Sequence, residues 1–143
     1  MAGALLGMED DNVTPFFEAE LAKYSSPSEA NLMLCSANSK DLSVLYINIV
    51  SLYSNFDEFS NLLTNFDEKI DLILLSETKI TEECNAEYHP YLENYSFFNI
   101  KSKSHFGSVA FFIRNSLVYS VRNDLNCSEF KLFEMLWLEI SCT

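Results

Sequence analysis

Apolar runs alternate with polar segments along residues 42–140, and their lengths indicate strands and one helix. The run SVLYINI at 43–49 contains no breaker and predicts a buried strand. The run IDLILL at 70–75 is apolar almost throughout, as is typical of a strand covered on both faces. Between them, apolar residues recur at helical spacing and predict one core-facing stripe, made of Phe56, Phe59, Leu62, Leu63 and Phe66.

The start of that helix carries a signal of its own. Residues 54–57, Ser-Asn-Phe-Asp, match a capping box that begins at Ser54. Asp57 and Glu58 would then lie in the first turn, where carboxylates suit the helix dipole. We therefore expect a helix of about three and a half turns after Ser54.

The second half of the chain reads as further strands. We expect them at 95–100, 109–114, 117–122 and 132–140, with a loop at 123–129 and the single tryptophan, Trp137, in the last strand. The first two flank the turn at 101–108 and predict a hairpin. The order is a β-α-β unit followed by antiparallel strands, which indicates an α/β fold.

The chain divides into two parts at about residue 41. With 143 residues and 48% apolar composition, it is expected to form one folded domain, at 42–143. Residues 1–41 read as an acidic, partly disordered extension, with a short helix that begins at Thr14-Pro15. A frayed tail that packs nowhere is the equal alternative for that helix.

A polar residue ends each strand of the β-α-β unit, namely Asn48 and Glu77. Parallel strands bring their carboxyl ends to one edge of a sheet, and ligands of open α/β sheets bind at that edge. We therefore expect the carboxamide and the carboxylate to face one shared spot. The alternatives are a buried asparagine satisfied by the backbone and a glutamate that caps the next turn.

Charge and residue types exclude several classes of site. The chain has 21 acidic and 9 basic residues, so it lacks the basic face of most nucleic-acid-binding proteins. Neither His89 nor His105 has a zinc-like spacing to a cysteine. We expect the thiols at positions 35, 84, 127 and 142 to be reduced in an intracellular protein, nuclear or cytoplasmic, without a membrane span. Lys101, Lys103 and His105 read as a solvated hairpin tip rather than a phosphate contact.

Taken together, five strings resemble the endonuclease/exonuclease/phosphatase superfamily. They are LYINIVSLYSNFDEFSNLL, IDLILLSET, YSFFN, GSVAFFIR and FEMLWLEI. Their order and spacing are most similar to the apurinic-like endonuclease domain of non-LTR retrotransposons. The resemblance covers about residues 42–140 and implies the N-terminal half of a two-sheet α/β sandwich.

The resemblance also implies a chemistry, the hydrolysis of DNA phosphodiesters with a divalent cation. By it, Glu77 corresponds to the acid that holds Mg²⁺, and Asn48 to the catalytic asparagine beside that acid. A single carboxylate holds Mg²⁺ weakly, because the ion keeps most of its waters. The family's arginine is Val50 here, and its glycine triplet is reduced to residues 106–108, Phe-Gly-Ser, which predicts a distorted turn.

The family's catalytic Asp-x-Asn, later acidic and Asp-His segments would fall after Thr143, so the resemblance implies a truncated domain that is inactive alone. Two alternatives remain open, a non-catalytic protein-interaction module and a fragment of a longer active endonuclease/reverse transcriptase polyprotein. Half of a sandwich exposes apolar sheet surface, which predicts association with a second copy, with a missing half of the domain or with a chaperone. The acidic chain predicts weak DNA binding.

Overall fold

The computed structural model describes residues 28–29, 31–32, 41–66, 70–83, 89–102, 107–129 and 133–141. Within these ranges the chain forms the helix α2 and a series of strands, in an order that begins β-α-β. The elements are β1 (Val44–Asn48), α2 (Leu52–Leu63), β2 (Leu72–Ser76), β3 (Tyr95–Ile100), β4 (Val109–Arg114), β5 (Tyr119–Val121), β6 (Cys127–Glu129), β7 (Phe133–Met135) and β8 (Leu138–Ile140). The fold class is α/β, as the order of the apolar runs predicts.

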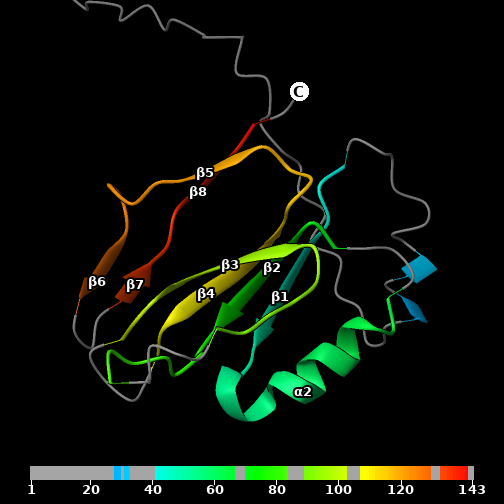
Figure 1. Cartoon of the computed structure of the whole chain (residues 1–143), viewed down its shortest axis with the longest axis horizontal. Coiled ribbons are helices and arrows are strands. Elements are labelled where there is room, and N and C mark those ends of the chain that lie inside the picture. The colour runs from blue at the N-terminus through cyan, green and yellow to red at the C-terminus, as the bar shows by residue number, and fades with distance from the viewer. Residues whose placement is uncertain are drawn as a thin grey trace, which may run out of the picture.

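Four strands form the main sheet in the order β1-β2-β4-β3 (Figure 1). β1 and β2 run parallel, and α2 makes the crossover that parallel neighbours require. β4 is antiparallel to both β2 and β3, so the hairpin predicted from 95–100 and 109–114 is confirmed. β1 and β3 are therefore the two edges of this sheet.

Helix α2 covers one face of the main sheet. Phe59 of α2 packs against Phe112 of β4, which is fully buried, with ring centroids 6.0 Å apart. Phe97 of β3 contacts the same Phe112 ring at a centroid distance of 4.8 Å. Phe56, Leu63 and Phe66 also pack against this core, so core packing is confirmed for four members of the stripe predicted from helical spacing, while Leu62 is not part of the described core. Full burial of a side chain such as Phe59 contributes about 1.5–3 kcal/mol.

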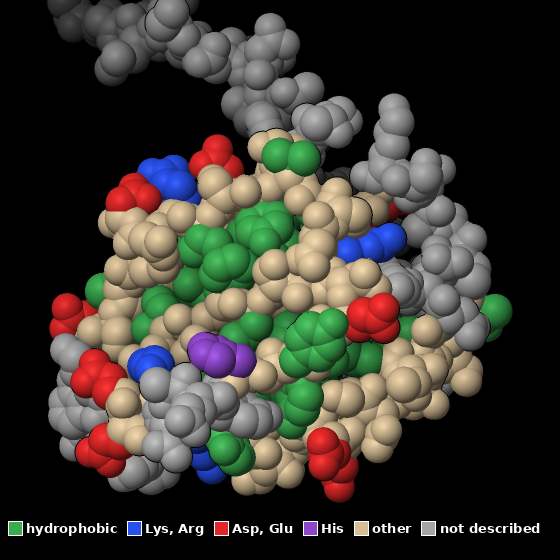
Figure 2. Space-filling model, viewed as in Figure 1, with side chains coloured by type: hydrophobic (Ala, Val, Ile, Leu, Met, Phe, Trp, Pro, Cys, Tyr) green, Lys and Arg blue, Asp and Glu red, His purple; other side chains and the backbone are tan. Residues whose placement is uncertain are grey.

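The other face of the main sheet carries a second cluster beneath β5 and β8. These two strands pair antiparallel, with Tyr119 opposite Ile140, and both side chains pack on buried Phe111 and Ile113. Figure 1 shows α2 and the β5–β8 pair on opposite sides of the main sheet. Helix, sheet and second sheet thus form the layers of an α/β sandwich. In Figure 2, hydrophobic side chains lie exposed in the middle of the view, with acidic side chains around them.

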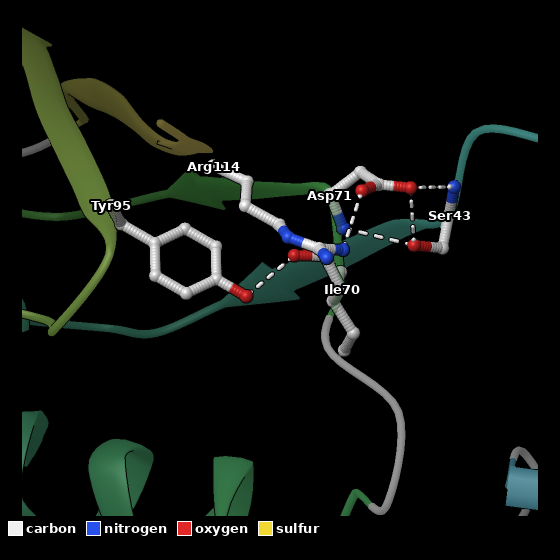
Figure 3. A network of polar contacts seen from close by, with 5 residues as sticks. All are labelled: Ser43, Ile70, Asp71, Tyr95 and Arg114. Carbon is white, nitrogen blue, oxygen red and sulfur yellow. Dashed lines mark hydrogen bonds and ion pairs between the residues drawn. The ribbon is translucent and has the colours of Figure 1, made fainter. Parts of the chain in front are cut away.

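A polar cluster fixes the register of β1 against β2 at their amino ends (Figure 3). Asp71 Oδ2 accepts hydrogen bonds from Ser43 N at 3.0 Å and from Ser43 Oγ at 2.9 Å. Ser43 Oγ in turn accepts from Asp71 N at 2.9 Å. Arg114 of β4 donates to Asp71 Oδ1 at 3.0 Å, and the hydroxyl of Tyr95 donates to the carbonyl of Ile70. All four strands of the main sheet are therefore tied together where the β-α-β unit begins.

The helix starts earlier than its capping signal predicts, and the prediction of Ser54 as its first cap is wrong. The N-cap is Ser51, whose hydroxyl accepts from Ser54 N, and the first turn holds no acidic residue. The physical reason is tertiary. Leu52 is fully buried and its N–H donates to the carbonyl of Thr78 at 2.9 Å, so the chain turns into the helix as it leaves β1. The helix also ends earlier, at Leu63.

The apolar run at 43–49 predicts a buried strand, and this prediction is wrong for β1. It lies at a sheet edge, and its side chains alternate between exposed and half-buried. Val44 and Tyr46 are 51% and 65% exposed, because the second sheet does not extend over β1. The run at 70–75 does behave as predicted, since β2 is largely covered on both faces.

The last strands are shorter and more divided than predicted. Residues 117–122 contribute only β5, and the expected loop at 123–129 contains β6, which pairs with β7. The run at 132–140 splits into β7 and β8 around Trp137, whose N–H donates to Asn126 Oδ1 at 2.9 Å instead of joining a ladder. Trp137 lies outside both strands and is 47% exposed.

Most of residues 1–41 lie outside the described ranges, including the helix predicted at Thr14-Pro15, so the division into 1–41 and 42–143 stays a prediction. A hydrogen bond of 2.7 Å from Asn31 Nδ2 to the carbonyl of Asn65, just after α2, joins the two parts. In the described ranges no helix has the length and apolar character needed to cross a membrane.

Candidate functional site

The two polar strand ends of the β-α-β unit meet, as the parallel pairing predicts. Asn48 is the last residue of β1 and lies opposite Ser76, the last residue of β2, so Glu77 follows directly beside it. Asn48 Nδ2 donates to Glu77 Oε1 at 2.9 Å, and both side chains are exposed. Asn48 is therefore not the buried asparagine of the alternative interpretation. The hydrogen bond establishes their proximity, while their catalytic and metal-binding roles stay predictions.

The backbone around this pair is strained. Val50, Ser51 and Glu77 have positive φ angles of 54°, 138° and 53°. Such angles are uncommon outside glycine and are outliers for a β-branched residue such as Val50. Each costs on the order of 1–3 kcal/mol, and such residues cluster at functional sites. The strain lies on both sides of the Asn48–Glu77 pair, where the chain leaves β1 and β2.

A second pair of polar side chains, Tyr46 and Ser76, lies beside the Asn48–Glu77 pair on the same face of the sheet. The hydroxyl of Tyr46 lies 2.8 Å from Ser76 Oγ, and alternation along β1 puts Tyr46 on the face that carries Asn48. Sequence reasoning missed both residues, because it considered only strand ends. The available signal was the period-two spacing of Tyr46 and Asn48 within an otherwise apolar strand.

The segment after Glu77 is held in place by buried hydroxyl groups. Thr78 and Ser108 are 1% and 0% exposed, and their hydroxyls share a short hydrogen bond. Ser108 Oγ also accepts from Ile80 N at 3.0 Å. Ser108 itself has a φ of 66°, a conformation that glycine adopts without strain. The serine therefore keeps the strained turn and supplies the acceptor that a glycine would lack.

Gly107 is the close-approach position of that turn. Its φ is +85°, and a Cβ added there would lie 2.8 Å from Glu134 Oε2 of β7. Gly107 O accepts from Lys79 N at 3.1 Å. Because Glu134 lies close to Gly107, β7 is next to the segment that follows Glu77. Glu134 is a further residue that sequence reasoning missed, since only the packing of β7 on the turn reveals it.

The donor set at the strand ends fits a cation only loosely. Within the described residues no group of three or more His, Cys, Asp or Glu side chains is arranged to hold a metal ion. The pair itself offers the Glu77 carboxylate and the Asn48 amide oxygen, which are hard donors of the type that Mg²⁺ prefers. Since Mg²⁺ retains several waters and takes only one or two carboxylates, these residues fit a largely hydrated ion.

Other candidate residues lie elsewhere. His89 and Lys101 are exposed in the segments that flank β3, and no catalytic role falls on either. Lys103 and His105 lie outside the described residues, as do the cysteines at 35, 84 and 142. Cys127 of β6 carries a free thiol, and the reduced state of all four cysteines stays a prediction.

Comparisons with known proteins give one likeness of fold. No protein-family model matches the chain, and no curated protein does. A solved structure, the catalytic domain of APE2 from Xenopus laevis, is similar with a TM-score of 0.43 and 24% sequence identity. The likeness covers 55% of this chain and 26% of that one, so this chain spans about a quarter of the solved domain. At this level the likeness assigns neither an activity nor a residue role.

Proposed function

We propose that the Asn48–Glu77 pair is a weak divalent-cation and phosphate site in an endonuclease-like fold, and that the chain is a metal-dependent phosphodiester hydrolase by ancestry. The observation that carries the proposal is the 2.9 Å hydrogen bond from Asn48 Nδ2 to Glu77 Oε1 at the carboxyl ends of two parallel strands. Ligand sites of open α/β sheets lie at this edge. The retrotransposon origin implied by the sequence motifs belongs to the same proposal.

In this proposal the two side chains have different tasks. The Glu77 carboxylate would hold Mg²⁺, which when bound neutralises charge on a phosphate oxygen. The Asn48 amide adds no charge. Its Nδ2 donates to Glu77 and orients the carboxylate, and the Asn48 Oδ1 can then accept a hydrogen bond from water. The strained backbone at Val50 and Glu77 fixes where both groups point.

The described residues predict little turnover from the chain alone. A hydrolase needs a group that takes a proton from the attacking water, and among the described residues no hydrogen bond joins the one described histidine, His89, to Asn48 or Glu77. The formal net charge of −12 also disfavours approach of a nucleic-acid backbone. We therefore expect metal-dependent contact with DNA to be weak and activity without a further protein segment to be near background.

Mg²⁺ itself is the first probe. Titration of the full chain with Mg²⁺, followed by the NMR signals of the Asn48 side-chain amide, should give saturable shifts. Glu77→Gln keeps the acceptor for Asn48 Nδ2 and removes the charge, so it should abolish the shifts. Glu93→Gln is the matched control, because Glu93 is exposed and precedes β3 at the opposite end of the sheet. Shifts that persist in Glu77→Gln, or are absent from the native chain, contradict the proposal.

Cleavage is tested separately on supercoiled plasmid with Mg²⁺. Nicking by the native chain that disappears in Glu77→Gln would support the site and refute the expectation of inactivity. Background nicking by both, together with Mg²⁺ binding at Glu77, would support a site that survives without turnover.

One observation favours the alternative of a non-catalytic protein-interaction module. Large apolar side chains stay exposed on the described part of the fold, among them Tyr46 at 65% and Trp137 at 47%. Recovery of a stable complex that forms equally with the native chain and with Glu77→Gln would favour this alternative over the metal site.

A further inference from the structure

The outer edge of β1 presents backbone groups with no strand beside them. β1 is the terminal strand in the order β1-β2-β4-β3, and among the described residues its one strand neighbour is β2. Ile49 N donates to Ser76 O, and Ser43 O accepts from Leu72 N. Backbone N–H and C=O groups of alternate residues point to the same side of a strand. Residues 43, 45, 47 and 49 therefore face β2, and Val44, Tyr46 and Asn48 direct their N–H and C=O groups outward.

This edge lacks the features that usually prevent strand pairing between molecules. Natural edge strands carry charged side chains, proline or a bulge. From Leu42 to Phe56 the sequence has no charged residue and no proline, although the chain as a whole has a net charge of −12. The pairing of β1 with β2 runs without a bulge from Val44–Leu72 to Asn48–Ser76. Val44 and Tyr46 add apolar side chains that are 51% and 65% exposed.

We propose that two copies of this chain associate through β1, as antiparallel strands related by a twofold axis that passes through the Tyr46 pair. Tyr46 then lies opposite Tyr46 of the second copy, and Val44 lies opposite Asn48. The outward N–H and C=O groups of these residues meet as hydrogen-bonded pairs, which is the geometry of an antiparallel ladder. The two main sheets become one continuous sheet, with both α2 helices on the same face.

The charge pattern identifies the partner as a second copy. Two strongly acidic chains repel each other unless they meet where neither carries charge. The segment around β1 is the longest uncharged stretch of the sequence, and the twofold axis opposes it to itself. Each residue on the sheet face then has an uncharged partner, and the two Tyr46 rings form a cross-strand aromatic pair.

The dimer also brings the candidate site to the interface, because Asn48 is both the last residue of the pairing edge and the donor to Glu77. The association does not depend on the proposed metal chemistry. It concerns backbone groups, whereas the metal site concerns the Glu77 carboxylate, so Glu77→Gln should leave association unchanged.

Sedimentation of the full chain over a range of concentrations tests the proposal. The native chain should shift from monomer to dimer mass as its concentration rises. Tyr46→Lys and Tyr46→Glu should each stay monomeric, because like charges would face each other at the twofold axis. An equimolar mixture of the two variants should restore the dimer mass, since a lysine would then face a glutamate.

Two control variants separate charge repulsion at the Tyr46 pair from a general effect of substitution on dimerisation. Tyr46→Phe removes only the hydroxyl contact with Ser76 and should dimerise like the native chain. Tyr91→Lys adds the same charge at an exposed tyrosine outside the strands and should also dimerise. Monomeric native chain up to about 1 mM, the weak limit of specific association, overturns the proposal. Dimers of Tyr46→Lys that match the native ones overturn it as well.

Amide hydrogen exchange provides a readout that does not depend on mass. In the dimer the amides of Val44, Tyr46 and Asn48 should exchange slowly, because they lie within a ladder. In Tyr46→Lys the amides of Val44 and Asn48 should exchange fast, while Ile47, whose N–H faces β2, stays protected. Fast exchange at Asn48 in a native sample of dimer mass would place the interface elsewhere and overturn the proposal.

Discussion

Ser43 and Asp71 exchange four hydrogen bonds where β1 and β2 begin, and the register that they fix is the one that brings Asn48 to Glu77 where the strands end. A slip of one residue would turn every side chain of β1 to the opposite face. The polar cluster at the amino ends of β1 and β2 therefore determines the geometry of the candidate site at their carboxyl ends.

Asp71→Ala should lower the free energy of unfolding by about 2–4 kcal/mol. The change leaves Ser43 N without its acceptor and Arg114 without its half-buried ion-pair partner, and bonds to charged groups contribute about 1.5–3 kcal/mol each. Urea denaturation followed by circular dichroism measures the loss. Asp124→Ala is the matched control, because Asp124 pairs with Arg122 at an exposed surface, and it should leave the urea midpoint nearly unchanged. Equal losses for the two variants would show that Asp71 does not fix the register.

Stability should fall at alkaline pH in a way that depends on Tyr95. Burial raises the pKa of the Tyr95 phenol above its ordinary value of 10.0; the positive charge of Arg114 opposes this shift and the negative charge of Asp71 adds to it. The unfolded chain loses that proton first, so the folded state binds more protons above the unfolded pKa. The stabilisation is complete below pH 10.0 and disappears as the pH rises through the folded value.

Tyr95→Phe isolates this contribution. It removes the hydrogen bond to the carbonyl of Ile70, which should cost about 0.5–1.5 kcal/mol at neutral pH. Its free energy of unfolding should then depend less steeply on pH above 10 than that of the native chain, as urea titrations at several pH values would measure. Identical slopes for the two proteins would mean that Tyr95 titrates normally.

Gly107→Ala should destabilise the protein by roughly 1–2 kcal/mol. The backbone there has a φ of +85°, which costs a residue with a side chain about that much, and the new Cβ would lie 2.8 Å from Glu134 Oε2. Thermal unfolding would measure both terms together. Adding Glu134→Ala separates them, because it removes the clash and leaves the backbone cost. Recovery should thus be partial, and complete recovery would show that the conformation of Gly107 costs little.

Asn48→Asp should convert the pair into a stronger cation site, if the proposed function is correct. A second carboxylate replaces the amide that donates to Glu77, so like charges face each other without metal and the melting temperature in chelator should fall. Mg²⁺ should then raise the melting temperature of the variant more than that of the native chain, because ligand binding stabilises the folded state. Asn99→Asp, a substitution on β3, is the control and should show no added response to Mg²⁺. An equal response from Asn48→Asp and Asn99→Asp would count against a site at Asn48.

The sequence by itself determined the β-α-β unit and the proximity of the two site residues. The apolar runs at 43–49 and 70–75 and the helical stripe between them allow one arrangement, two parallel strands with a crossover helix. That arrangement already brings the ends of both strands to one edge, which is why the proximity of Asn48 and Glu77 was predictable.

The tertiary structure decided what depends on neighbours distant in sequence. Apolar content indicates that a strand is buried, but not whether it lies in the centre or at the edge, and β1 became an edge because β4 pairs with the other side of β2. The N-cap moved to Ser51 because Leu52 donates to Thr78 and is buried, a contact that local capping patterns do not contain. The Tyr46–Ser76 contact likewise joins separate strands, and Glu134 of β7 lies close to Gly107 in the turn before β4. Local periodicity indicates whether a segment is a helix or a strand. Strand order and contacts between distant residues depend on how all the elements pack together, which no single segment of the sequence specifies.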